Sequence, residues 1–138
     1  MPQKDRIHEV VKNALIKDGW TITADPFILV YEGIRVYADL SAEQTFAAER
    51  AGRKIVVEIK SFLSPSPLHD FQQALGQYTV YRDLLELTDL DYQPYLAITH
   101  EVYRRVFSQK AIRTLCDKNR LALLVVDSEK EEVLQWIE

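Results

Sequence analysis

The sequence has few of the residues that break regular structure or cross-link it. It contains only four glycines, five prolines and one cysteine in 138 residues. Because Cys116 is the single cysteine, an internal disulfide is excluded, and we expect a reducing, cytoplasmic location. No low-complexity tract or internal repeat is present, which argues against a disordered or repeat protein. With 47% hydrophobic residues, residues 1–138 are expected to form one compact domain.

Long apolar runs and strong charge of one sign are also missing. The longest apolar runs, such as residues 121–126, are far too short to span a bilayer, so no membrane segment is expected. The polar start, residues 1–5, does not resemble a secretory signal. A net charge of −4 argues against strong, indiscriminate binding to nucleic acid. It does not exclude a nuclease, because an acidic metal site contributes negative charge of its own.

One strand-like run, residues 53–62, carries an acid and a base among β-branched residues. Strand side chains alternate between faces, so Glu58 and Lys60 share one face with Val56. A run that is apolar on both faces is typical of a central strand, where a charge is costly unless it is paired or holds a metal. The pair is therefore either a salt bridge within the strand or part of a functional site.

Asp39 supplies the acid that a metal site would need. It ends a second strand-like run, residues 34–39, and lies 19 positions before Glu58. The carboxylates of Asp39 and Glu58, with the carbonyl of Ile59, are the hard oxygen ligands that Mg²⁺ or Mn²⁺ prefers. Lys60 would then orient the attacking water and offset charge on a phosphate. An acid followed by Glu-x-Lys resembles the pattern of the PD-(D/E)xK nucleases, the restriction-endonuclease-like superfamily.

Two helices are predicted to flank this strand. Residues 5–18 have apolar residues at helical spacing, and Gly19 can end the helix. Glu9 lies on the face opposite the apolar stripe, where it is either solvated surface or a supporting acid for the site. The second helix spans residues 67–87, with Ser66 as its N-cap.

A polar ridge follows the second helix. Gln73, Gln77 and Tyr81 are spaced four residues apart, so they stack along one side of it. Such a ridge is either the solvated margin of the helix or a surface that faces the site. The spacing Gln77-x-x-x-Tyr81 resembles a motif that follows the lysine strand in the RecB-like branch of the nuclease superfamily.

The remaining segments predict an α/β fold with a mixed central sheet flanked by helices. Before the central strand we expect a meander, and after it a right-handed βαβ unit and an edge strand. The expected strands are residues 20–23, 27–31, 34–39, 45–50, 95–98, 121–126 and 133–137, with a hairpin turn at Ala51-Gly52 and a helical segment at 101–118. The last third is locally basic, but its charges scatter around the helix, which favours a solvated face over a binding stripe. These basic residues are Arg104, Arg105, Lys110, Arg113, Lys118 and Arg120.

Several motifs in order resemble the XisH family, the fdxN element excision controlling factors. They are Lys-Asp-x-x-His at residues 4–8, Tyr37-x-Asp39-Leu40, Ala47-Ala48-Glu49-Arg50, Val57-Glu58-Ile59-Lys60-Ser61-Phe62 and Ala74-Leu75-Gly76-Gln77-Tyr78. The resemblance covers essentially the whole chain and implies a restriction-endonuclease-like core. It also implies a role in programmed excision of a DNA element during heterocyst differentiation, with an XisI-type partner and a site-specific recombinase. Ala38 departs from the superfamily pattern, which often has proline before the first acid.

Two hypotheses for the function follow from the sequence. In the first, the protein is an Mg²⁺- or Mn²⁺-dependent DNA endonuclease or nickase. Its metal ligands are Asp39, Glu58 and the carbonyl of Ile59, its water-positioning residue is Lys60, and its supporting residues are Gln77, Tyr81 and Glu9. In the second, it is a non-catalytic subunit that binds DNA or protein and controls a recombinase. The sequence leaves a homodimer open in either case.

Overall fold

The computed structural model describes residues 3–36 and 45–138. Its helices are α1 (Gln3–Lys17), α2 (Pro67–Leu87), α3 (His100–Val102), the π-helical turn η1 (Tyr103–Phe107) and α4 (Lys110–Lys118). Its strands are β1 (Thr21–Ala24), β2 (Leu29–Tyr31), β3 (Ile34–Val36), β4 (Thr45–Arg50), β5 (Arg53–Ile59), β6 (Gln93–Thr99), β7 (Leu123–Asp127) and β8 (Glu132–Ile137). None of the helices that the structure describes is both long enough and apolar enough to cross a membrane.

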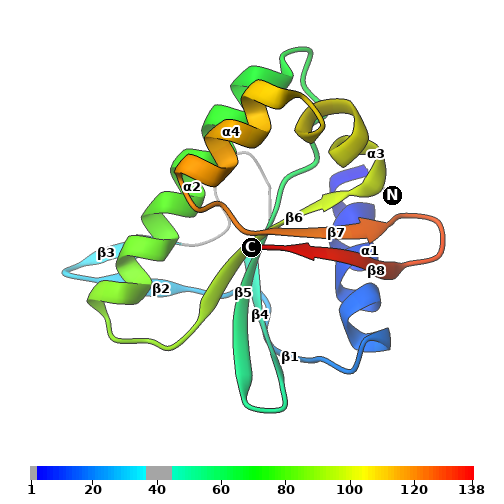
Figure 1. Ribbon diagram of the computed structural model, residues 1–138. Coiled ribbons are helices and arrows are strands. Elements are labelled where there is room, and N and C mark those ends of the chain that lie inside the picture. The colour runs from blue at the N-terminus through cyan, green and yellow to red at the C-terminus, as the bar shows by residue number, and fades with distance from the viewer. Residues whose placement is uncertain (1–2, 37–44) are drawn as a thin grey trace.

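A six-stranded mixed sheet, in the order β1-β4-β5-β6-β7-β8, forms the centre of the molecule (Figure 1). Strands β5, β6 and β7 are parallel, whereas β1, β4 and β8 run antiparallel to their neighbours. Helices α2 and α4 lie together over one face, and α1 lies on the other (Figure 1). The predicted α/β architecture is confirmed, and β5 lies inside the sheet as its apolar residues require.

Helix α1 forms because its apolar residues recur every three or four positions. Val10, Val11, Ala14 and Leu15 are buried in the main core with the β5 residues of the same face. Gly19 follows the helix with φ of 92°, a left-handed conformation that glycine adopts without strain.

Three polar side chains of α1 hold it against the turn between β7 and β8. Each reaches a residue more than 110 positions later in the chain. Arg6 Nη2 donates to Ser128 O at 3.4 Å, Asn13 Nδ2 to Glu131 Oε1 at 2.7 Å, and Lys17 Nζ to Lys130 O at 2.7 Å. The first helix and the last hairpin are therefore packed as neighbours.

Strand β5 buries both of its faces, as its sequence predicts. Ile55 and Val57 are fully buried on the face of α1. Val56 points the other way and packs in a second cluster with Leu84 and Leu85 of α2. Since Glu58 and Lys60 keep the parity of Val56, this alternation directs them toward α2.

The predicted meander is wrong in its pairing. Strand β1 pairs with β4, with Ile22 opposite Ala48, and β2 and β3 form a separate two-stranded ribbon. Phe27 and Leu29 are buried against the C-terminal half of α2, and this packing keeps the ribbon out of the main sheet. The predicted end of its second strand, residues 37–39, lies outside the described residues.

The predicted helix at 101–118 is also not continuous. It consists of α3, the turn η1 and α4, with an interruption before Lys110. Gln109 there has an extended backbone, with ψ of 131°, and acts as the N-cap position of α4. The break allows Val106 and Phe107 to be buried from η1 and Ile112 from α4, against the same sheet.

Candidate functional site

Two oppositely charged side chains are buried at the end of β5. Glu58 is 6% exposed and Lys60 is 4% exposed. Lys60 Nζ donates a hydrogen bond to Gln73 Oε1 of α2 at 3.1 Å. This contact places the lysine on the α2 side of the sheet, where strand alternation predicts it. Lysine side chains are usually exposed to solvent, so a buried, hydrogen-bonded lysine is unusual.

The pair lies at an edge where parallel strands end together. Lys60 N donates to Ala97 O of β6 at 3.3 Å, so β5 and β6 stay side by side up to this point. In α/β sheets, ligands are commonly bound outside the carboxyl ends of the strands. The position of Glu58 and Lys60 is therefore one that the fold makes suitable for a binding site.

The segment after Lys60 is held in one conformation by several contacts. Phe62 is 1% exposed and has φ of 56°, a left-handed conformation that a bulky residue rarely adopts. Its carbonyl accepts a hydrogen bond from Arg105 Nη2 at 3.1 Å. Ser64 N donates to Oδ2 of the buried Asp70 at 3.2 Å. Such over-determined backbone is typical of functional sites.

Helix α2 begins directly after this segment. Ser66 has extended backbone and its side chain accepts a hydrogen bond from His69 N at 3.2 Å, which confirms the predicted N-cap. Pro67 occupies the first turn, where its missing N–H costs nothing. This start fixes the direction in which α2 crosses the sheet and brings Gln73 to Lys60.

The charge of Glu58 is felt by Tyr78 of α2. Burial raises the pKa of Tyr78, the hydrogen bond from Ala122 N and the charge of Arg82 partly oppose this, and Glu58 makes a smaller contribution that raises it. The Tyr78 hydroxyl donates to Pro94 O at 3.0 Å and accepts from Ala122 N at 3.3 Å. Tyr78 therefore stays protonated and joins α2 to β6 and to the chain entering β7.

Asp39 lies outside the described residues, so its position relative to Glu58 is not determined. The nearest described residue downstream is Thr45, which is the direct β-partner of Glu58. Among residues 3–36 and 45–138, no group of three His, Cys, Asp or Glu side chains is arranged to hold a metal ion. Within that part of the chain, the hard oxygen donors are Glu58 and the carbonyl of Ile59, and Asp39 would be the third ligand.

The other predicted site residues lie in three places. Gln77 is half-buried on α2, one turn beyond Gln73. Tyr81 is 4% exposed and packs in the cluster beneath the C-terminal half of α2. Glu9 is exposed on α1, with its Oε1 atom 3.8 Å from Nδ1 of His8. The structure thus brings together Glu58, Lys60 and the start of the polar ridge on α2.

Sequence reasoning assigned no role to Asp70 or Arg105, and it placed Gln73 on the ridge without pairing it to Lys60. Gln73 is detectable because it is four residues before Gln77. Asp70 has a weaker signal, as an acid in the first turn of a helix that follows a proline-rich segment. The hydrogen bond from Arg105 to Phe62 O joins residues 43 positions apart, and no local sequence pattern predicts it.

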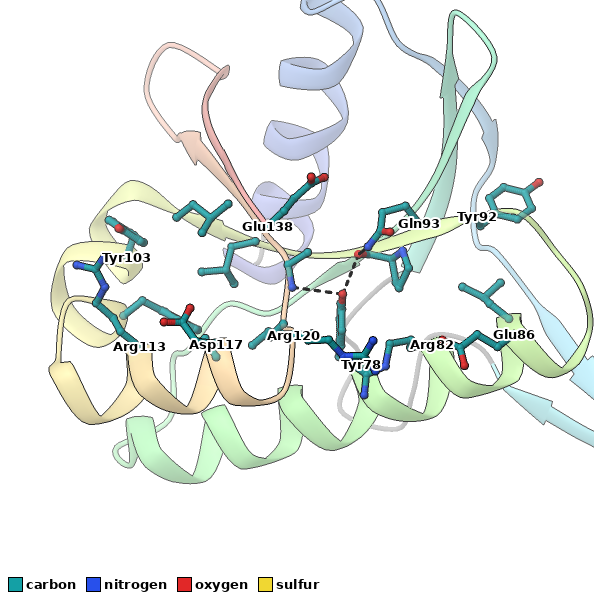
Figure 2. A pocket seen from close by; sticks show the side chains of 18 of the residues that line it. Tyr78, Arg82, Glu86, Tyr92, Gln93, Tyr103, Arg113, Asp117, Arg120 and Glu138 are labelled. Atoms are coloured by element: carbon teal, nitrogen blue, oxygen red, sulfur yellow. Dashed lines mark hydrogen bonds between the residues drawn. The ribbon is translucent and has the colours of Figure 1, made fainter.

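A separate cavity of about 580 Å³ begins at the amino ends of β6 and β7 and extends along α4 to η1 (Figure 2). It is bounded by α2, η1, α4, the amino ends of β6 and β7, and the end of β8, and Tyr78 forms part of its wall (Figure 2). Its charged side chains balance, with three arginines and three carboxylates. These are Arg82, Arg113, Arg120, Glu86, Asp117 and Glu138. This balance gives no preference for an anion.

The cysteine thiol in the cavity wall is not an activated nucleophile. Cys116 lines the wall, and burial raises the pKa of this thiol to about 11. The thiol is therefore protonated at neutral pH.

The fold and the site define an α/β protein with a buried acid–base pair at the carboxyl end of its central parallel strands. Comparison with known proteins narrows this class. The sequence profile of the XisH protein family matches residues 1–134, and the chain belongs to the XisH family. No curated protein sequence matches the chain.

Two crystal structures are similar over nearly the whole chain. An XisH family protein from Nostoc punctiforme PCC 73102 is 37% identical, with a TM-score of 0.88, covering 96% of this chain and 99% of that one. A fdxN element excision controlling factor protein from Anabaena variabilis is 40% identical, with a TM-score of 0.88, covering 97% and 99%. The family predicted from the sequence motifs is confirmed.

Proposed function

We propose that this XisH protein is a metal-dependent DNA endonuclease or nickase of the PD-(D/E)xK type, with a restriction-endonuclease-like core, acting in excision of a DNA element. The observation that carries the proposal is the burial of both Glu58 and Lys60 at the end of β5, with Lys60 hydrogen-bonded to Gln73 of α2. The name of the Anabaena variabilis relative supports the setting, since it is called an excision controlling factor.

Each residue has a defined role in this proposal. The carboxylates of Asp39 and Glu58 and the carbonyl of Ile59 would hold Mg²⁺ or Mn²⁺, which polarises a phosphate and lowers the pKa of bound water. Lys60 donates to the attacking water and to the phosphate oxygens on which charge develops. Gln73 orients the Lys60 ammonium, and Gln77 and Tyr81 continue the same ridge along α2. Glu9 is exposed on α1, on the other face of the sheet, and it takes no direct part in this proposal.

The test is conversion of supercoiled plasmid to the nicked form, with Mg²⁺ or Mn²⁺ and with EDTA. Wild-type protein is expected to nick only with metal, and Asp39→Ala or Glu58→Gln should lower the rate by roughly 100-fold, because loss even of a group that supports a metal ligand costs about 10–100-fold. Glu86→Gln is the matched control, because it removes one exposed carboxylate from α2 at the far end of the sheet. Equal nicking by all three variants would attribute the activity to a contaminant and overturn the proposal.

Metal binding can be measured without cleavage. An ion that binds only the folded state raises the melting temperature by mass action. Mg²⁺ or Mn²⁺ should therefore raise the melting temperature of the wild type, and Asp39→Asn with Glu58→Gln should abolish the rise. EDTA-treated wild type serves as the baseline.

A second candidate is a non-catalytic accessory subunit that binds DNA, or an XisI-type partner and a recombinase, in the cytoplasm. The printed name of the Anabaena variabilis relative favours it, because a controlling factor need not cut DNA. It makes the opposite prediction for both measurements above. Absence of nicking together with absence of a metal-dependent melting shift would select the accessory function.

A further inference from the structure

An arginine from a second strand connection reaches the candidate site. β6 ends beside β5, and Thr99 at its end caps the next helical segment, with its side chain accepting from Val102 N at 3.3 Å. α3 and η1 therefore rise from the same sheet edge as Lys60. Arg105 in η1 extends toward the β5 side and donates from Nη2 to Phe62 O, two residues after Lys60.

Aromatic packing fixes this arginine relative to Lys60. The rings of Phe62 and Phe107 are 5.4 Å apart in an edge-to-face arrangement, and Phe107 meets Phe71 of α2 at 5.8 Å. All three phenylalanines are 1% exposed. The segment after β5, the turn η1 and the start of α2 thus pack as one body. The π-helical turn η1 lies at this junction, as such turns often do at functional sites.

Arg105 keeps donors for a further ligand. Its side chain belongs to an exposed residue, and a guanidinium carries five N–H donors, of which the contact with Phe62 uses one. Capping one carbonyl needs only a single neutral donor. A planar, permanently charged group at this position matches a phosphate, which it can bind through two parallel hydrogen bonds.

We propose that Arg105 is a phosphate-binding residue and that the DNA backbone lies across the carboxyl ends of β5 and β6, between Lys60 and η1. This inference rests on the proposed function for the identity of the ligand as DNA, but not on cleavage. It assigns a role to one member of the basic set that sequence analysis favoured as a solvated face. Arg105 is a positioning residue here, since it holds the strand that Lys60 and the acids act on.

The test is the affinity for a short labelled DNA duplex in EDTA, so that no cleavage takes place, measured over roughly 50–200 mM KCl. Arg105→Gln keeps a donor for Phe62 O but removes the charge. It should weaken binding about tenfold at low salt and reduce the slope of log K against log salt by about 1, the loss of one phosphate contact. Arg105→Lys should keep most of the slope.

Arg120→Gln is the matched control. It removes the same charge from the segment between α4 and β7, in the cavity wall at the amino end of β7, and should leave the slope unchanged. Arg105 could act only by holding Phe62 O or also by binding phosphate, and melting temperatures in EDTA separate these roles. If its role is only structural, Arg105→Gln should lower the melting temperature and leave the salt slope unchanged.

The outcomes separate this proposal from the nuclease proposal. A reduced slope for Arg105→Gln alone supports it, whether or not the wild type nicks plasmid. Equal slopes for Arg105→Gln and Arg120→Gln overturn it, even if nicking is observed. If the wild type shows no measurable binding to DNA, the Arg105 proposal is also overturned. The plasmid-nicking assay tests the proposed nuclease function separately.

Discussion

Glu58 and Lys60 are ionisable side chains that the fold buries almost completely. Removing one partner of a buried pair leaves an uncompensated charge, but replacing both by neutral groups of similar size is often neutral or stabilising. Glu58→Gln with Lys60→Met is therefore expected to leave the free energy of unfolding unchanged or to raise it, by up to about 4 kcal/mol, while abolishing metal-dependent nicking. Urea denaturation and the plasmid assay check the two parts.

The matched control for this double variant is Glu49→Gln with Lys54→Met. Glu49 and Lys54 face each other across β4 and β5 nearer the hairpin, and Lys54 is exposed. An exposed pair contributes little, so the free energy of unfolding should change by less than about 1 kcal/mol and nicking should be kept. Marked destabilisation of the Glu58/Lys60 variant would indicate that its charges serve the fold and not catalysis.

The buried hydroxyl of Tyr78 is expected to contribute measurably to the free energy of unfolding. Tyr78→Phe leaves Ala122 N without its partner in the interior and removes one donor from Pro94 O, which keeps the bond from Gln93 Nε2. We expect a loss of roughly 1–3 kcal/mol in the free energy of unfolding, measured in urea. Tyr92→Phe, a half-buried tyrosine of the same cavity, should lose less than about 0.5 kcal/mol. A similar loss in both variants would contradict the role given to the Tyr78 hydroxyl.

For single residues, the sequence predicts well which face of a strand a side chain occupies, but it predicts its hydrogen-bond partner poorly. Strand alternation is a local rule, so it correctly gave Glu58 and Lys60 a common face toward α2. The hydrogen bond from Lys60 to Gln73 depends on where α2 crosses the sheet, and that crossing is set by packing of residues far apart in the chain. The placement of Asp39 stays a prediction.

The hairpin between β4 and β5 has a turn that suits its sequence poorly. Ala51 has φ of 50° and Gly52 has φ of 81°, and two positive φ values define the type I′ turn that favours Asn-Gly. Alanine in this region is strained, so Ala51→Asn should raise the free energy of unfolding by roughly 0.5–1 kcal/mol. Thermal or urea unfolding checks this.

Gly52→Ala provides the opposite change in the same turn. Although a Cβ at Gly52 would meet no neighbour within 4 Å, the positive φ itself disfavours alanine. The variant should therefore be less stable by about 1 kcal/mol. If both substitutions shifted stability in the same direction, the turn would not have the described conformation.

Elements with strong local signals were predicted closely, and elements defined by distant pairing were not. Helix α2 has the predicted bounds because Ser66 and Pro67 mark its start and its apolar stripe continues to Leu87. Strand β1 pairs with β4, although β2 and β3 lie between them in the sequence. The turn residues near Gly33 predict a hairpin, but they do not indicate which sheet its strands join. The interruption before Lys110 has no glycine or proline to signal it.

For the whole molecule, the C-terminal strands are expected to be essential to one domain. β6 covers the open side of β5, and β7 continues the same parallel sheet. A fragment ending before Tyr95 would expose the fully buried Ile55 and Val57 at a new sheet edge. It should be insoluble or unfolded by circular dichroism and sedimentation. A soluble fragment that unfolds cooperatively would show that residues 95–138 form a separate module.

The attachment of α1 to the last hairpin has a consequence for synthesis on the ribosome. Arg6, Asn13 and Lys17 contact residues that are translated 113 to 122 positions later. At typical elongation rates of 5–20 residues per second, the helix emerges roughly 6–24 s before that hairpin exists. During this interval β4 and β5 can cover only part of the stripe around Val11 and Leu15, because the surface that β7 and β8 supply is still missing. The nascent chain therefore offers an early binding site to chaperones and completes its fold only after β8 has left the exit tunnel.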